Sequence, residues 1–367
     1  MQQPWILTAA MGSRVPHIFL AIVSTICAVV PASAQDVLLG EANALREHHP
    51  GLFALVGRLE RAHGVLLDGL ADEGDVVRAS GTDLPTYDFE FDMIDRMTLI
   101  VQDQTASDAE VEVADRGYAR LGARAVDVVR WGQAFQREVL SALADPEQTD
   151  ARRALTALVE QYRSRADIAL PSVPKNMDIL YDHQYALGFR TGYADLDGFL
   201  WAGHWLRLAA TEPFTDIEPG AERLAGIDTV STRYYAKLSY GAPPAFFPSE
   251  IPLAPAISPG LIWISAETAM IWDNLSMLLE VFADVLASPD TPDVPAALEA
   301  TLDFFLDPEM AVTDQDEWEI MALRHGIFYQ GGYPLTVMTE SERNVGGHAA
   351  HFAESGPTLT IPGMPRR

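Results

Sequence analysis

Cysteine is nearly absent from this sequence, which has a single one, Cys27, in 367 residues. Cys27 lies in an N-terminal segment that we expect to be removed on export, so the mature chain would contain none. Disulfide bonds, a thiolate nucleophile, a cysteine-ligated iron–sulfur cluster and a thioether-attached haem c are therefore excluded from the mature protein. Any metal would need histidine, aspartate, glutamate or backbone ligands.

The motifs of several common enzyme classes are also missing. The sequence contains no Gly-x-Ser-x-Gly elbow, no Walker loop and no Gly-x-Gly-x-x-Gly fingerprint. The usual serine hydrolase, nucleotide-binding and dinucleotide-binding classes therefore lack their signatures. A catalytic triad without a local motif stays open, because triads are defined by geometry.

Basic residues are scarce relative to acidic ones, with 25 Lys and Arg against 52 Asp and Glu and a net charge of −27. Such a charge repels nucleic-acid phosphates and anionic membranes, so we expect no nucleic-acid partner. Solubility or adaptation to salt explains the charge more simply than a role in collecting cations. Because 48% of the residues are hydrophobic, the chain is too apolar to be an acidic disordered protein.

The N-terminal residues indicate export. Arg14 precedes a run at 18–30 that is apolar apart from one serine and one threonine, and Ala32-Ser33-Ala34 then supplies the small residues that a signal peptidase recognises. We interpret 1–34 as a secretory signal peptide and expect a periplasmic or secreted protein that begins at Gln35. The apolar run is shorter than the ~20 residues of a spanning helix, which favours cleavage over a membrane anchor. We expect no stable membrane span in the mature chain.

Helical periodicity dominates the rest of the chain, and strand patterns are few. After Pro50, which can occupy the first position of a helix, apolar residues recur at steps of three, four and seven. They are Leu52, Leu55, Val56, Leu59, Leu66 and Leu70. Further helices are expected at 108–144, at 149–169 and from Asn176. We predict an all-α, multi-helix globular protein, with at most one small β-ribbon near the C-terminus around 333–339.

Six prolines between Gly241 and Gly260 argue against a helix there and predict an extended segment on the surface of the helices. We expect 241–260 to join two helical halves, an N-terminal part at 35–240 and a C-terminal part at 261–367. The apolar stretch at 261–286 is interrupted by four carboxylates, which favours a buried core helix over a membrane span.

The first candidate site lies between His183 and His204. Residues seven apart lie nearly above one another on a continuous helix. His183, Arg190, Asp197 and His204 have this spacing, and Tyr193 and Trp201 fall on the same side. This stripe is either the solvated face of an amphipathic helix or the lining of a cleft between helices.

In the cleft interpretation, Arg190 holds an anionic group of the substrate. A ligand would then contact the other polar and aromatic members of the stripe, His183, Tyr193, Asp197 and Trp201. If the protein is an enzyme, which stays open, His204 or His325 would act as the general acid or base.

The second candidate is a metal site in the Gly/His-rich C-terminal part. His348 and His351 would share one face of a helical turn that follows Gly347. Together with Glu342, His325 or a carboxylate from another element, they could hold a divalent metal through histidine and carboxylate ligands. No His-Glu-x-x-His motif supports this set, and histidines in a Gly-rich tail are more often solvent-exposed than liganding.

Arginine is concentrated within the expected 108–144 helix. The residues are Arg116, Arg120, Arg124 and Arg130. In so acidic a protein this face is expected to meet the protein's own carboxylates from another helix, and a docking patch for an acidic partner is the functional alternative.

These features together predict an exported, soluble helical protein with a polar, aromatic-lined cavity. That cavity would be formed by the 183–204 helix, the 261–286 helix and the C-terminal tail, and it would bind a small anionic or polar ligand or a metal held by histidine and carboxylate. The alternative is a non-catalytic binding or assembly factor for another exported protein, acting through the Pro-rich segment and the apolar helix that follows it.

Overall fold

The structure is a computed structural model that describes residues 43–81, 87–102, 108–216, 219–239, 251–326 and 360–365. Within these ranges every regular element is a helix, apart from one isolated antiparallel bridge between Lys175 and Val312. The all-α prediction is confirmed. The expected signal peptide and the β-ribbon around 333–339 lie outside these ranges. None of the described helices is both long and apolar enough to cross a membrane.

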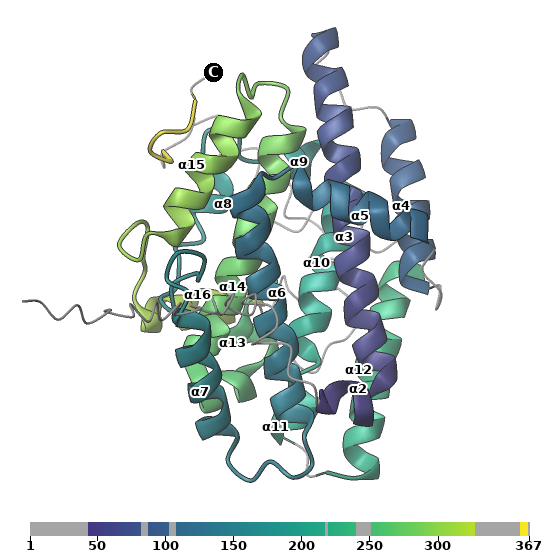
Figure 1. Ribbon diagram of the computed structural model, residues 1–367, viewed down its shortest axis with the longest axis vertical. Helices are drawn as coiled ribbons and strands as arrows, with labels where there is room; N and C mark the ends of the chain where they lie inside the picture. Colours follow the sequence, from purple (N-terminus) through teal and green to yellow (C-terminus); the bar gives the residue numbers. More distant parts are fainter. Residues whose placement is uncertain are drawn as a thin grey trace, which may run out of the picture. The chain divides into compact units, whose positions relative to one another are not determined.

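Figure 1 shows the arrangement of the helices. In chain order they are α2 (Ala44–His48), α3 (Pro50–Ser80), α4 (Tyr87–Gln102), α5 (Asp108–Ala119), α6 (Ala123–Ala144), α7 (Ala151–Arg163), α8 (Ile179–Asp182), α9 (Gly188–Gly192), α10 (Ala194–Ala209), α11 (Glu212–Asp216), α12 (Ala221–Ser239), α13 (Ala254–Ile257), α14 (Pro259–Ala287), α15 (Val294–Leu306) and α16 (Gln315–Gly326).

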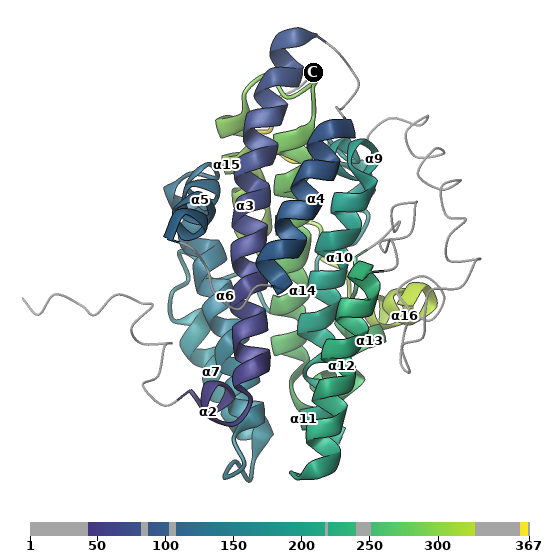
Figure 2. The same cartoon turned by 90° about the vertical axis from the view of Figure 1, so that its right-hand side faces the viewer.

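The core forms between long helices that run alongside one another, α3, α6, α10 and α14 (Figures 1 and 2). All six apolar residues predicted for the face of α3 are buried, as expected for the inward stripe of an amphipathic helix. The predicted core helix at 261–286 corresponds to α14, which packs against α3, α6, α7, α9 and α15. Three of its four carboxylates, Asp273, Glu280 and Asp284, are buried, whereas the side chain of Glu267 is 52% exposed.

The Pro-rich segment is only partly as predicted. Residues 241–250 lie outside the described ranges, and the remainder includes the short helix α13 and the start of α14. Both helices have proline in their first two positions, where a missing N–H removes no helical hydrogen bond. Ile251, Leu253 and Ile257 are buried, so this part of the segment belongs to the core and not to the surface.

The helix expected from Asn176 through His204 is broken into α8, α9 and α10. Leu187 has a left-handed backbone with φ 66° just before α9, and Tyr193, with φ −136° and ψ 65°, separates α9 from α10. These breaks leave the first N–H groups of α9 and α10 without partners inside their own helices.

Carboxylates from other helices accept hydrogen bonds from those N–H groups. Asp284 Oδ1 on α14 accepts from Phe189 N at 2.8 Å, at the start of α9. Glu90 Oε1 on α4 accepts from Asp195 N at 2.7 Å, at the start of α10. A negative charge at a helix N-terminus is favourable, so tertiary contacts stabilise helix ends that the local sequence leaves uncapped.

The expected 108–144 helix is broken as well, at Gly122, whose φ of 88° suits a residue without Cβ. The break lets α5 turn away from α6 and pack closely on α3. Gly64 on α3 and Gly117 on α5 meet at this crossing, and a Cβ at Gly117 would overlap the Gly64 carbonyl oxygen. The α3–α5 contact therefore depends on glycine at both positions.

The arginines of α5, α6 and the turn between them pair with the protein's own carboxylates, which confirms that prediction. Arg116 Nε lies 2.9 Å from Asp68 Oδ1 on α3, and Arg124 Nη1 lies 2.5 Å from Glu299 Oε1 on α15. Arg120 pairs with Asp68 and Asp72, and Arg130 pairs with Asp115. Both partners are exposed in the Arg124–Glu299 and Arg130–Asp115 pairs, and exposed pairs contribute little stability each, about 0–1 kcal/mol.

Candidate functional site

The predicted stripe meets α14 in the core. His183, Arg190, Asp197 and His204 are each at most 2% exposed, so the solvated-face alternative is wrong. His183 and Arg190 lie beside Asp284 of α14, and His204 lies beside Glu280, which also interacts electrostatically with Asp197. We call these six residues the buried polar seam. The broken helix still brings the stripe together, because α8, α9 and α10 all pack around the carboxylates of α14.

His183 has both ring nitrogens engaged at one end of the seam. Nδ1 accepts from Tyr185 N at 3.3 Å, and Nε2 lies 3.2 Å from Asp284 Oδ2. Nε2 therefore carries the proton and donates a hydrogen bond to the Asp284 carboxylate. Burial lowers the pKa of His183, although Asp284 opposes this shift. This histidine positions Asp284 and has no free nitrogen for a ligand.

Arg190 and Asp284 form the charged centre of the seam, with Arg190 Nη2 3.2 Å from Asp284 Oδ2. Burial alone would raise the pKa of Asp284, but Arg190 and His183 outweigh it and lower that pKa. A buried pair of this kind is stable only while both partners are present. Arg190 is thus committed to a carboxylate of its own chain, and its predicted role in gripping a substrate stays untested.

The other end of the seam holds Asp197, His204 and Glu280. His204 Nε2 lies 3.4 Å from Glu280 Oε1. Burial raises the pKa of Glu280 to about 8, and burial together with Arg207 lowers the pKa of His204 to about 3. Burial, reinforced by Glu280, raises the pKa of Asp197 well above its ordinary range. The three groups therefore share the interior mainly in their neutral forms.

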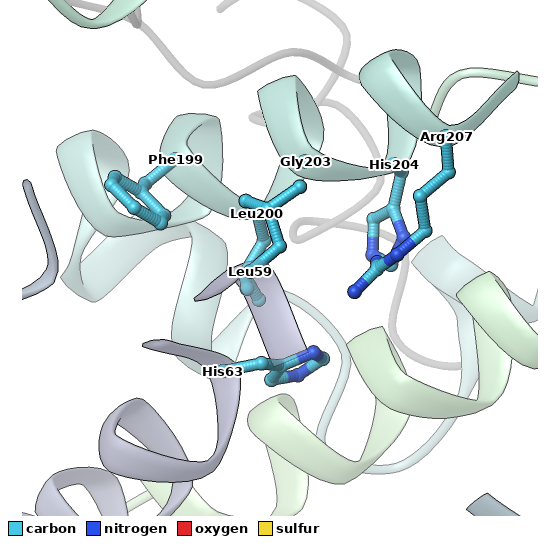
Figure 3. Close-up of a pocket in the computed structure, with 7 residues that line it drawn as sticks. All are labelled: Leu59, His63, Phe199, Leu200, Gly203, His204 and Arg207. Carbon is cyan, nitrogen blue, oxygen red and sulfur yellow. The ribbon is translucent and has the colours of Figure 1, made fainter. Parts of the chain in front are cut away.

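A cavity of about 10 Å³ adjoins this end of the seam. Figure 3 shows His63 of α3 on one side, with His204 and Arg207 of α10 on the other. His63 Nε2 has no hydrogen-bond partner in the described part of the chain. Burial, with His204 and Arg207, lowers the pKa of His63. The space suits about one water molecule, which leaves no room for a substrate beside His204.

The aromatic members of the stripe are buried too. Tyr193 is 2% and Trp201 4% exposed, and the Tyr193 ring packs edge-on against Phe89 of α4 with centroids 5.3 Å apart. Both rings therefore contribute to the packing of α10. Their predicted part in ligand binding stays a prediction, as does acid or base catalysis by His204.

The predicted metal ligands cannot be placed. His348, His351 and Glu342 lie outside the described residues, and His325 is in α16 but its side chain is not described. Over the described ranges, no group of three or more His, Asp or Glu is arranged to hold a metal ion. A divalent metal at the C-terminal histidines therefore stays a prediction.

A second and larger pocket, of about 460 Å³, opens between α3, α5 and α6. Its lining follows one face of each helix at helical spacing. The residues are Gly57, Glu60 and Arg61 on α3, Val111, Ala114, Asp115 and Tyr118 on α5, and Arg130, Gln133 and Arg137 on α6. We call it the arginine pocket, because three arginines line it in a strongly acidic chain.

Two of these arginines are already paired. Arg137 Nη1 pairs with Glu60 Oε2, and Arg130 Nη2 lies 3.0 Å from Asp115 Oδ1. Arg61 is different, because it forms no ion pair with any described carboxylate, and its Nε is buried without a hydrogen-bond partner. The arginine pocket therefore offers one guanidinium that no carboxylate of the described residues neutralises.

The wall behind these charges is fixed by hydrogen bonds. Gln133 Nε2 donates to Tyr118 Oη at 2.9 Å, and Tyr118 Oη donates to the Glu60 carbonyl oxygen at 2.8 Å. Burial raises the pKa of Tyr118, so the phenol remains a donor at neutral pH. These hydrogen bonds thus hold α3, α5 and α6 together around the pocket.

Sequence reasoning singled out Arg130 but missed Arg61 and Arg137. The available signal was their helical spacing. Glu60 and Arg61 follow Gly57 at steps of three and four on α3, and Arg130, Gln133 and Arg137 are three and four residues apart on α6. That signal does not say which two faces meet. The break at Gly122 and the glycine contact between α3 and α5 decide it.

Comparison with known proteins gave no match to a family model, to a curated protein or to a solved structure. What the chain binds must be inferred from its own side chains.

Proposed function

We propose that this is an exported binding protein that takes a small anionic ligand in the arginine pocket. The observation that carries the proposal is Arg61, a guanidinium without a carboxylate partner among the described residues, facing a pocket of about 460 Å³ in a chain of net charge −27. The guanidinium fork matches the geometry of a carboxylate or phosphate. Export rests on the apolar run at 18–30 and the Ala-Ser-Ala sequence that follows.

The size and construction of the pocket support this assignment. Small-molecule sites usually have volumes of about 300–1,000 Å³ and a few placed polar groups on a rigid frame. The arginine pocket meets both conditions, because the Gln133–Tyr118–Glu60 hydrogen bonds hold its wall. The cavity beside the buried polar seam meets neither, since it is the size of about one water molecule.

The experiment is thermal unfolding of the mature protein at constant ionic strength with phosphate, glutarate or valerate as probes. A ligand that binds only the folded state raises the melting temperature with its concentration. At least one probe should do so for the wild type, and the R61Q variant should lose about tenfold or more in affinity. Gln is a good helix former, so the substitution leaves α3 intact.

The matched control is R165Q, which removes an exposed arginine that pairs with Asp167 outside the pocket. Its response to the probes should equal that of the wild type. The proposal is wrong if no probe shifts the wild type, or if R61Q and R165Q respond alike.

One observation favours a second candidate, the assembly factor. Trp263 is 81% exposed near the start of α14, directly after the Pro-rich segment. An exposed tryptophan of this kind is a common anchor in protein interfaces. If this second proposal holds, W263A should lose an exported partner protein that R61Q retains, as measured by affinity capture from the native compartment.

A further inference from the structure

We propose that the arginine pocket selects organic monocarboxylates over dicarboxylates and other dianions. This inference rests on the proposed function and names its ligand class. It follows from the charges of the pocket lining and from the neutral surface between them.

The first step is the charge that the pocket leaves for a ligand. Arg137 is held by Glu60 and Arg130 by Asp115, so four of the five charged side chains of the lining cancel in pairs. Arg61 supplies the remaining positive charge. One ligand carboxylate therefore neutralises the lining.

A second anionic group would have no cation of its own. To pair with Arg130 or Arg137, it would have to displace Asp115 or Glu60. These carboxylates belong to α5 and α3, which form the pocket, so they cannot leave it. Left unpaired, it would lie near those carboxylates and in the field of a chain with net charge −27. Like charges in such positions repel one another, and the repulsion is stronger near a protein surface than in bulk water.

The rest of the lining suits an apolar part of a ligand rather than a second charged group. Gly57 and Ala114 are small, and Val111 is 41% exposed although it is apolar. A Cβ at Gly57 would meet no other atom within 4 Å, so the space above it is open. A short aliphatic chain attached to the carboxylate could cover this surface and remove Val111 from water.

The experiment compares valerate with glutarate by isothermal titration calorimetry at pH 8 and constant ionic strength. The two acids have the same number of carbons and differ by one carboxylate. Wild-type protein should bind valerate about tenfold or more tightly than glutarate. R61Q should lose the binding of both.

Two variants test the charge count directly. D115N releases Arg130, and E60Q releases Arg137, so each adds one uncompensated positive charge to the pocket. Either variant should raise glutarate affinity and shift the valerate-to-glutarate preference by about tenfold. The control D167N releases Arg165, which lies outside the pocket, and should leave the preference unchanged. Circular dichroism confirms that each variant is folded.

The possible failures are distinct. If glutarate binds the wild type as tightly as valerate and R61Q loses both, the anion pocket stands and monocarboxylate selection is wrong. Selection is also wrong if neither D115N nor E60Q, both folded, changes the preference. If the wild type binds neither acid nor phosphate, the proposed function fails and this inference fails with it.

Discussion

His204 Nε2 of α10 lies 3.4 Å from Glu280 Oε1 of α14, inside the core. The distance suggests a salt bridge, but burial favours the neutral form of both groups. With the pKa of His204 lowered to about 3 and that of Glu280 raised to about 8, both groups are mainly neutral at pH 7. The contact that joins α10 to α14 is therefore between neutral polar groups, and it should respond to pH at both extremes.

The unfolding free energy of E280Q should increase relative to that of the wild type as the pH rises. Folded protein keeps the Glu280 proton up to a pKa of about 8, whereas the ordinary pKa is 4.5. Between these values the folded state binds more protons, so the wild type loses unfolding free energy as the pH rises, by up to about 1.4 kcal/mol per pH unit. Urea unfolding at pH 5, 6, 7 and 8 measures the difference between E280Q and wild type. A difference that does not change with pH would contradict this assignment.

Three buried histidines, His63, His183 and His204, should make the protein sensitive to acid. Their pKa values are all lowered below the ordinary value of 6.5, so the unfolded chain binds more protons in acid. Stability should therefore fall as the pH drops below about 6.5. H204Q should weaken this dependence, whereas H48Q, which changes an exposed histidine, should not. Equal acid profiles for all three proteins would rule out the buried neutral state.

Asp273 should be required for docking α13 and α16 onto α14. Its carboxylate accepts from Ala254 N at 3.1 Å and from Trp318 Nε1 at 3.1 Å. D273A leaves both buried donors unpaired, at about 1–3 kcal/mol each. D273N retains one acceptor oxygen and should lose less. Denaturant unfolding measures both, and near-UV circular dichroism reports the environment of Trp318. A D273A variant as stable as the wild type would disprove this anchoring role.

Gly117 should be required for both stability and the arginine pocket. In G117A the new Cβ would overlap the Gly64 carbonyl oxygen and force α5 away from α3. Overpacking of this kind destabilises by about 1–3 kcal/mol. Because α5 carries one wall of the pocket, G117A should also weaken valerate binding in the calorimeter. G51A is the control, since a Cβ there meets no other atom within 4 Å. Matching results for the two variants would show that the glycine contact is dispensable.

The predicted C-terminal metal site has its own test. Mature protein purified from its native compartment without chelators should contain near-stoichiometric divalent metal by elemental mass spectrometry. The H348A/H351A double variant should lose that metal, and E342Q should bind it more weakly, because each removes a ligand. H48Q, at the other end of the chain, should retain it. Metal-free wild-type protein would eliminate this site.

Part of the fold and one charged surface could be read directly from the sequence. The buried face of α3, from Leu52 to Leu70, follows from local periodicity, because an amphipathic helix must bury its apolar stripe wherever it packs. Arg116 and Arg124 pair with carboxylates of the same chain, as their number in so acidic a protein indicated. These predictions required only the spacing and charge of nearby residues.

The positions of the helix breaks could not be read in the same way. Leu187 has no local feature that favours a left-handed backbone. The N-terminal amides of α9 and α10 donate hydrogen bonds to Asp284 and Glu90, which are 95 and 105 residues away in the sequence. A continuous helix was therefore the natural expectation from local sequence. Three polar members of the stripe, His183, Arg190 and His204, nevertheless come together at the carboxylates of α14. Their predicted part in ligand binding or catalysis stays a prediction.

The sequence by itself determined that this protein is helical and acidic, and which residues could face inward, because those properties depend on composition and on spacing within one helix. The tertiary structure decided which faces meet. It buried His204 and Arg190 against α14, where helix packing excludes water, and it left Arg61 at a pocket between α3, α5 and α6. Ionisation and exposure depend on neighbours from distant parts of the chain, so only the folded arrangement could distinguish a buried polar seam from an open pocket.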